Sequence, residues 1–84
     1  MKVWNVVCLD QHTEDFQFEQ LFRRQPTVDE VVKTVDTWMT GEITLVSSSN
    51  DQESLVVRQV VDPSIFPLNR LLIVNVIEQE LTRN

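Results

Sequence analysis

The chain has 84 residues, 42% of them hydrophobic, and its 13 acidic side chains outnumber seven lysines and arginines, so that the net charge is −6. This length makes one domain, residues 1–84, with a single small core. The one cysteine, Cys8, cannot form an internal disulfide, which excludes a disulfide-stabilised secreted fold and favours a reducing, cytoplasmic setting. The acidic balance argues against direct binding of nucleic acid or an anionic membrane, because cationic side chains bind phosphate groups. No apolar run reaches the roughly 20 residues of a membrane-spanning helix.

The chain begins with a predicted pair of strands. Residues 2–9 are apolar on both faces, which is typical of a central strand covered on both sides. A polar loop follows over residues 10–15. The alternation over residues 16–19 then predicts a second strand, paired back onto the first as a hairpin. Leu21 and Phe22 either continue this strand or begin the turn that leads to the next element.

Residues 27–41, TVDEVVKTVDTWMTG, form the clearest predicted element, an amphipathic helix. Six apolar side chains fall within about 120° of the helical wheel, namely Val28, Val31, Val32, Val35, Trp38 and Met39. Thr27 and Glu30 have the spacing of a capping box. Gly41 is expected to close the last turn in a left-handed conformation.

Three further strands are predicted at residues 42–48, 54–61 and 70–77. Two prolines interrupt the sheet within residues 62–69, where Ile65, Phe66 and Leu68 are expected to close one end of the core. The polar residues 78–84 are expected to form a helical turn or to fray. The predicted order is therefore β-β-α-β-β-β, an α+β domain with an antiparallel-rich sheet and one helix packed on one face.

One helix covers only one face of such a sheet, yet several strands are apolar on both faces. The second face is therefore expected to meet a different protein or a second copy of the chain. The alternative is that the 62–69 loop and the chain ends cover it. We assign this open face to Trp4, Val6, Val74 and Val76.

Charged side chains gather in the two predicted turns. The acids are Asp10, Glu14, Asp15 and Glu19 in the first turn region, and Asp51 and Glu53 in the second. They either contact a basic surface on a protein partner or are only solvated. The basic pair Arg23 and Arg24 either holds an anionic group of a partner or caps local acids.

The sequence predicts neither enzymatic activity nor a cofactor or metal. The single glycine excludes a P-loop or dinucleotide fingerprint, and one cysteine with one histidine excludes a four-ligand zinc site of these residues. His12 lies among carboxylates, but its loop lacks the ligand spacing of a calcium loop and is expected to be solvated. Cys8 as a nucleophile beside His12 is disfavoured, because a thiolate within an apolar strand is costly to desolvate.

The size, the acidity and the β-β-α-β-β-β layout together resemble small inhibitor proteins of phages and mobile elements, anti-CRISPR proteins among them. The resemblance covers the whole chain and rests on layout, with no signature residues. It implies a stoichiometric protein that blocks a site on a host protein or nucleoprotein complex. We therefore predict a non-enzymatic protein-binding module. A homodimeric structural subunit is the alternative, and an enzyme or metal protein that uses His12 is the third hypothesis.

Overall fold

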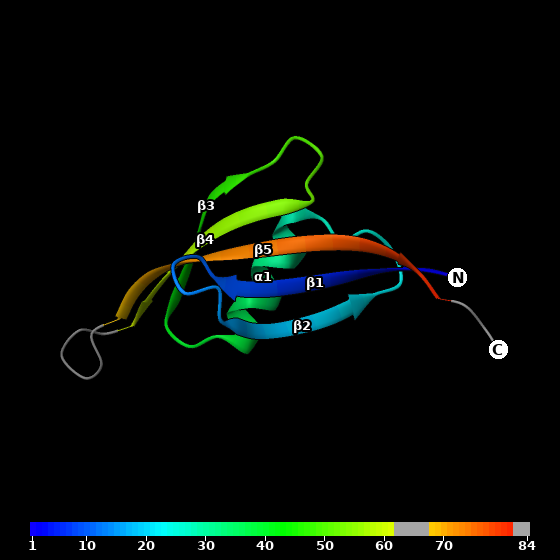
Figure 1. The fold of residues 1–84 in the computed structure, drawn as a ribbon. Coiled ribbons are helices and arrows are strands. Elements are labelled where there is room, and N and C mark those ends of the chain that lie inside the picture. The colour runs from blue at the N-terminus through cyan, green and yellow to red at the C-terminus, as the bar shows by residue number, and fades with distance from the viewer. Residues whose placement is uncertain (62–67, 82–84) are drawn as a thin grey trace.

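The computed structural model describes residues 1–61 and 68–81, which form a five-stranded antiparallel sheet and one helix (Figure 1). The elements are β1 (Lys2–Asp10), β2 (Phe16–Phe22), α1 (Val28–Trp38), β3 (Glu42–Ser48), β4 (Ser54–Val61) and β5 (Leu68–Glu80). The predicted α+β class is confirmed for these residues. The expected plug at Ile65 and Phe66 lies outside the described residues.

The strands lie in the order β2-β1-β5-β4-β3, and each neighbouring pair is antiparallel. The prediction of a last strand at residues 70–77 was too short. β5 begins at Leu68, opposite Val61, and continues to Glu80, opposite Lys2. The polar end of β5 stays in the sheet because β1 pairs with its backbone as far as the start of the chain. β2 continues to Phe22, which is one of the two alternatives left open for Leu21 and Phe22.

A bulge in β2 divides its side chains between the two faces of the sheet. Cys8 pairs with Phe18 but the next residue, Leu9, pairs with Phe16, so that Gln17 is the extra residue of the bulge. Phe18 belongs to the core, and Gln17 hydrogen-bonds on the same side. Phe16 remains beside Leu9 on the opposite face of the sheet.

The start of α1 has the predicted capping box. The Thr27 hydroxyl accepts a hydrogen bond from the Glu30 backbone N–H at 3.2 Å, and the Glu30 carboxylate accepts from the Thr27 N–H at 3.1 Å. The same carboxylate accepts two hydrogen bonds from Arg24, at 2.8 and 2.7 Å. These bonds from Arg24, with the backbone bond from Thr27, hold the pKa of Glu30 at about 2, against an ordinary 4.5. Arg24 therefore caps a local acid, which was one of the two roles expected for the basic pair.

The helix ends earlier than predicted, at Trp38, and Met39 already has an extended backbone. Gly41 therefore does not close the last turn. Its φ of +88° is in the left-handed region, and a Cβ there would collide with the backbone carbonyl oxygen of Val60 in β4. This glycine is required by the close approach of β4 to the chain that leads into β3.

The core lies between α1 and one face of the sheet, where Val31 and Val35 pack against buried strand residues. These residues are Val6, Cys8, Phe18, Leu55, Val57, Leu72, Val74 and Val76. Trp38, expected within the buried stripe, is 55% exposed. Its ring stacks on that of Phe18 with 5.7 Å between centroids, and its Nε1 donates to Gln20 at 2.8 Å.

Because the folded pKa of Glu30 is depressed, its stabilising effect is present above pH 4.5 and is lost as the pH falls toward about 2. We expect the free energy of unfolding to fall across this range. In Glu30→Gln, the proton uptake that accompanies unfolding should decrease by about one between these limits. Urea denaturation at a series of pH values measures the slope.

The matched control is Glu14→Gln, in the exposed β1–β2 turn, which should leave the slope nearly unchanged. An acid limb of equal steepness in Glu30→Gln and in the wild type would contradict the role given to the Arg24–Glu30 pair.

Candidate functional site

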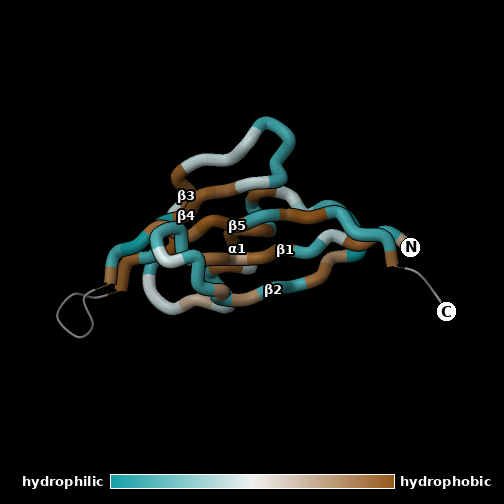
Figure 2. The backbone as a smooth tube through the Cα atoms, in the orientation of Figure 1, coloured by the Kyte–Doolittle hydropathy of each residue, from teal (hydrophilic) through white to brown (hydrophobic). Residues whose placement is uncertain are grey.

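The sheet face turned away from α1 has an apolar centre, and it faces the viewer in Figures 1 and 2. Leu9 of β1 pairs with Ile73 of β5, which pairs in turn with Val56 of β4. Phe16 of β2 lengthens this line because it pairs with Leu9. We call these four residues the apolar row. It crosses four neighbouring strands without a polar side chain.

Further apolar side chains lie on the same face. Val7 and Leu71 are next to the row, Val60 lies beyond Arg58, and Leu21 and Ile77 lie beyond Glu19 and Asn75. We call the row and these five residues the open face. Phe16 is 60% exposed, Leu21 57% and Ile77 44%. Contiguous apolar patches of several hundred Å² are uncommon on monomers and usually mark a binding surface. The open face is therefore the candidate site.

The residues expected on this face, Trp4, Val6, Val74 and Val76, lie instead on the side that α1 covers. Val6 and Val74 are fully buried, Val76 is nearly so, and Trp4 packs against the core. β1 and β5 are apolar on both faces, so their alternation does not indicate which face the helix selects. The correct residues are those at the alternate positions.

Among the described residues, three charged side chains lie on this side of the sheet: Glu42 of the edge strand β3, opposite Val60, and Arg58 and Glu19, which stand diagonally opposite each other about the apolar row. Arg58 of β4 pairs with Leu71, on one side of the apolar row. Glu19 of β2 pairs with Val7, on the other side of the row. Both side chains are exposed, and Arg58 makes no ion pair within residues 1–61 and 68–81.

Asn5 of β1 holds the Glu19 carboxylate, to which its Nδ2 donates at 3.0 Å. Asn5 is only 9% exposed, and its Oδ1 has no hydrogen-bond partner among the described residues. A buried acceptor without a partner costs about 1–3 kcal/mol. Asn5 therefore destabilises the monomer relative to an apolar residue, while it orients Glu19.

The two acidic turns end hairpins that point in opposite directions along the sheet. β1 and β4 are both antiparallel to β5, so they run in the same direction. The first turn follows the end of β1 and the second precedes the start of β4, and Figure 1 shows them pointing apart. The six acids predicted to contact a partner therefore do not form one surface.

Two of the six acids are engaged within their own turns. Asp10 is buried, and its carboxylate accepts from the backbone N–H groups of Thr13 and His12 at 2.9 and 2.8 Å, which lowers its pKa. Asp51 accepts from the Ser49 hydroxyl at 2.5 Å, which likewise lowers its pKa. The other four acids, Glu14, Asp15, Glu19 and Glu53, are exposed, as is Asp51. Their role in partner binding stays a prediction.

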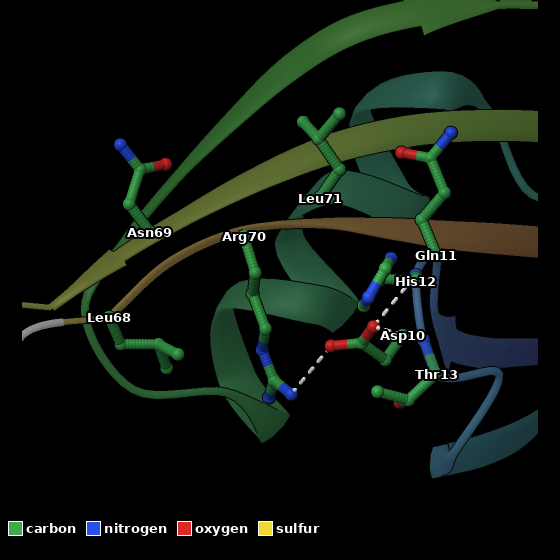
Figure 3. Close-up of a pocket in the computed structure, with 8 residues that line it drawn as sticks. All are labelled: Asp10, Gln11, His12, Thr13, Leu68, Asn69, Arg70 and Leu71. Carbon is green, nitrogen blue, oxygen red and sulfur yellow. Dashed lines mark hydrogen bonds and ion pairs between the residues drawn. The ribbon is translucent and has the colours of Figure 1, made fainter.

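Arg70 joins the strands at one end of the covered side. Its guanidinium donates to Asp10 at 3.0 Å (Figure 3), to Gln17 at 3.0 Å and to Gln59 at 2.8 Å. Gln59 then donates to the Thr40 carbonyl oxygen at 2.8 Å. We call these five residues the Arg70 network. Each guanidinium nitrogen has a partner, so Arg70 acts as a structural crosslink.

A groove runs beside the Arg70 network and is lined by Asp10, Gln11, His12, Thr13, Leu68, Asn69, Arg70 and Leu71 (Figure 3). His12 is exposed, and its backbone N–H rather than its imidazole is what contacts Asp10. Across residues 1–61 and 68–81, no three His, Cys, Asp or Glu side chains gather in a way that could hold a metal ion. Cys8 lies in the core, where burial raises its pKa to about 11 and disfavours the nucleophilic thiolate.

No protein-family model, curated protein or solved structure matches this chain. In the part of the chain that the structure describes, no helix combines the length and the apolar character needed to cross a bilayer. The open face is therefore a candidate site on its geometry alone.

Two polar residues within otherwise apolar strands are the features of the sequence that could have indicated this site. Asn5 is the one break in the apolar run of residues 3–9, and Arg58 is the one charge within β4. Their positions in the open face depend on the pairing of β1, β4 and β5, which local alternation does not give.

We expect Asn5→Val to raise the free energy of unfolding by about 1 kcal/mol, because it removes a buried acceptor that has no partner. Urea denaturation measures this change. Asn75→Val is the matched control, since Asn75 lies on the same face of β5 and reports the gain from strand propensity alone. A loss of stability in Asn5→Val, or a gain no larger than that of Asn75→Val, would contradict this assignment.

Proposed function

We propose that this chain is a non-enzymatic protein-binding module that binds its partner through the open face. The observation that carries the proposal is the apolar row on the face that α1 leaves uncovered. Burial of such a face on association contributes roughly 25 cal/mol for each Å² of apolar surface removed from water. The exposed position of His12 and the buried thiol of Cys8 support a role without catalysis.

The surroundings of the open face also suit a protein interface. Interfaces commonly have an apolar centre and a polar rim. The apolar row supplies the centre, Arg58 and Glu19 stand on opposite sides of it, and exposed acids lie in the two hairpin turns.

An inhibitor is one form that such a module takes. It would act by covering a functional site of a host protein or nucleoprotein complex. Glu14 and Asp15 in one hairpin turn, and Glu53 in the other, would then favour a target with basic patches around an apolar contact.

Two neighbouring residues of β5 give the sharpest test. Ile73 lies in the open face, whereas Val74 is fully buried beneath α1. Ile73→Glu should unfold cooperatively as the wild type does and bind its partner at least about tenfold more weakly. Val74→Glu should not fold, because it buries an unpaired charge. Circular dichroism separates the two outcomes.

Binding is measured with the tagged full chain, co-expressed with untagged chain in the cells from which it comes. Retained proteins, including the untagged copy, are quantified by mass spectrometry. Ile77→Glu repeats the test at a more exposed position, and Thr37→Glu, on the exposed side of α1, adds the same charge as a control. A partner retained equally by wild type and by both folded open-face variants would contradict the proposal, as would retention of nothing by the wild type.

A further inference from the structure

We infer that the partner of the open face is a second copy of this chain, packed face to face in a two-fold dimer in which Arg58 of each copy pairs with Glu19 of the other. The inference rests on the proposed function and adds the identity of the partner. It follows from the charges of the open face, its area and the placement of the acidic turns.

Arg58 and Glu19 are arranged symmetrically about the apolar row, while Glu42, on the same side of the sheet, lies on the edge strand β3 outside this pairing. Arg58 lies beside Leu71 and Glu19 beside Val7, one on each side of the row. The midpoint between them falls at the pair of Leu9 and Ile73, the centre of the open face. A two-fold axis above this point, lying between two facing sheets, exchanges their positions and brings each Arg58 against a Glu19.

These two charges cannot pair within one chain. Arg58 and Glu19 lie three strands apart across the sheet, and their positions differ by four residues along the strand direction. The distance is on the order of 20 Å, from strand spacings of about 4.8 Å and a rise of about 3.3 Å per residue. The Asn5 amide donates a hydrogen bond to the Glu19 carboxylate at the rim of the open face. The Glu19 side chain is therefore partly ordered before association, which lowers the entropy lost on binding.

The area of the face suits a second sheet of the same size. Five strands and the nine residues of β1 give a face of about 24 by 30 Å, or about 700 Å². A specific interface of standard size buries about 800 Å² on each partner. One further copy therefore covers the face almost completely.

The exchange of Arg58 with Glu19 makes the strands of the two copies cross at a large angle, near the orthogonal class of sheet packing. The acidic turns lie at the ends of the β1–β2 and β3–β4 hairpins and point in different directions (Figure 1). Glu14, Asp15, Asp51 and Glu53 in these turns therefore lie away from the apolar row at the centre of the contact.

The test is sedimentation equilibrium of the full chain, from about 1 to 500 μM, a range that reaches weak dimers. The wild type should reach twice the chain mass of 9.8 kDa. Arg58→Glu and Glu19→Arg should each weaken the dimer by about tenfold, since each creates two like-charge contacts. The double variant Arg58→Glu/Glu19→Arg should restore the wild-type affinity. Arg23→Glu and Glu14→Arg, exposed and outside the open face, are the controls.

Ile77→Glu keeps the test decisive if a charge variant does not fold, because it should yield a folded monomer. A monomeric wild type at the highest concentration overturns the inference, and so does a dimer that the charge variants do not change. If the chain is monomeric but retains a different protein in a manner that depends on Ile73, the second copy is excluded as partner and the proposed function stands. If Ile73→Glu changes neither self-association nor retention, both fail.

Discussion

One constraint governs this structure: a single short helix covers only one face of a sheet that is apolar on both faces. The helix has 11 residues and is therefore about 16 Å long, while five strands make a sheet about 24 Å wide. The central strands β1 and β5 carry apolar side chains on both faces. One set is buried with Val31 and Val35, and the other is left at the surface of the monomer.

Strands that are apolar on both faces also specify their register weakly. A slip of one residue in β5 would exchange its two sets of side chains, and both sets are hydrophobic. The Arg70 network specifies the register of β5, because Arg70 can hydrogen-bond to Asp10, Gln17 and Gln59 only when its side chain lies on the covered side. The partners come from β1, β2 and β4, so one side chain fixes the alignment of four strands. A charged group at the end of the core thus serves specificity where the apolar pattern does not.

The sequence was sufficient for features that depend on neighbouring residues. The capping box of Thr27 and Glu30, the α+β class and the excess of apolar strand surface all follow from local pattern. Features that depend on distant pairing were not accessible. Val6 and Val7 are the same residue type on opposite faces of β1, so hydrophobicity gives no reason to place one beneath the helix. The true ends of β5 depend on β1 and β4, and the role of Gly41 depends on the approach of Val60.

The open face differs from the outer face of an ordinary one-sided sheet in a way that favours function over solubility. Antiparallel sheets with one solvated face usually alternate apolar and polar residues. Here Leu9, Ile73 and Val56 occupy the solvent side of three adjacent strands, and Arg58 and Glu19 stand on opposite sides of the apolar row. Asn5 adds a cost to the monomer, since its buried oxygen has no described partner, yet its amide orients Glu19. A face that combines exposed apolar area with a carboxylate held at its edge suits the binding role that we propose, and the position of Arg58 is the reason that we propose a copy of the same face as its partner.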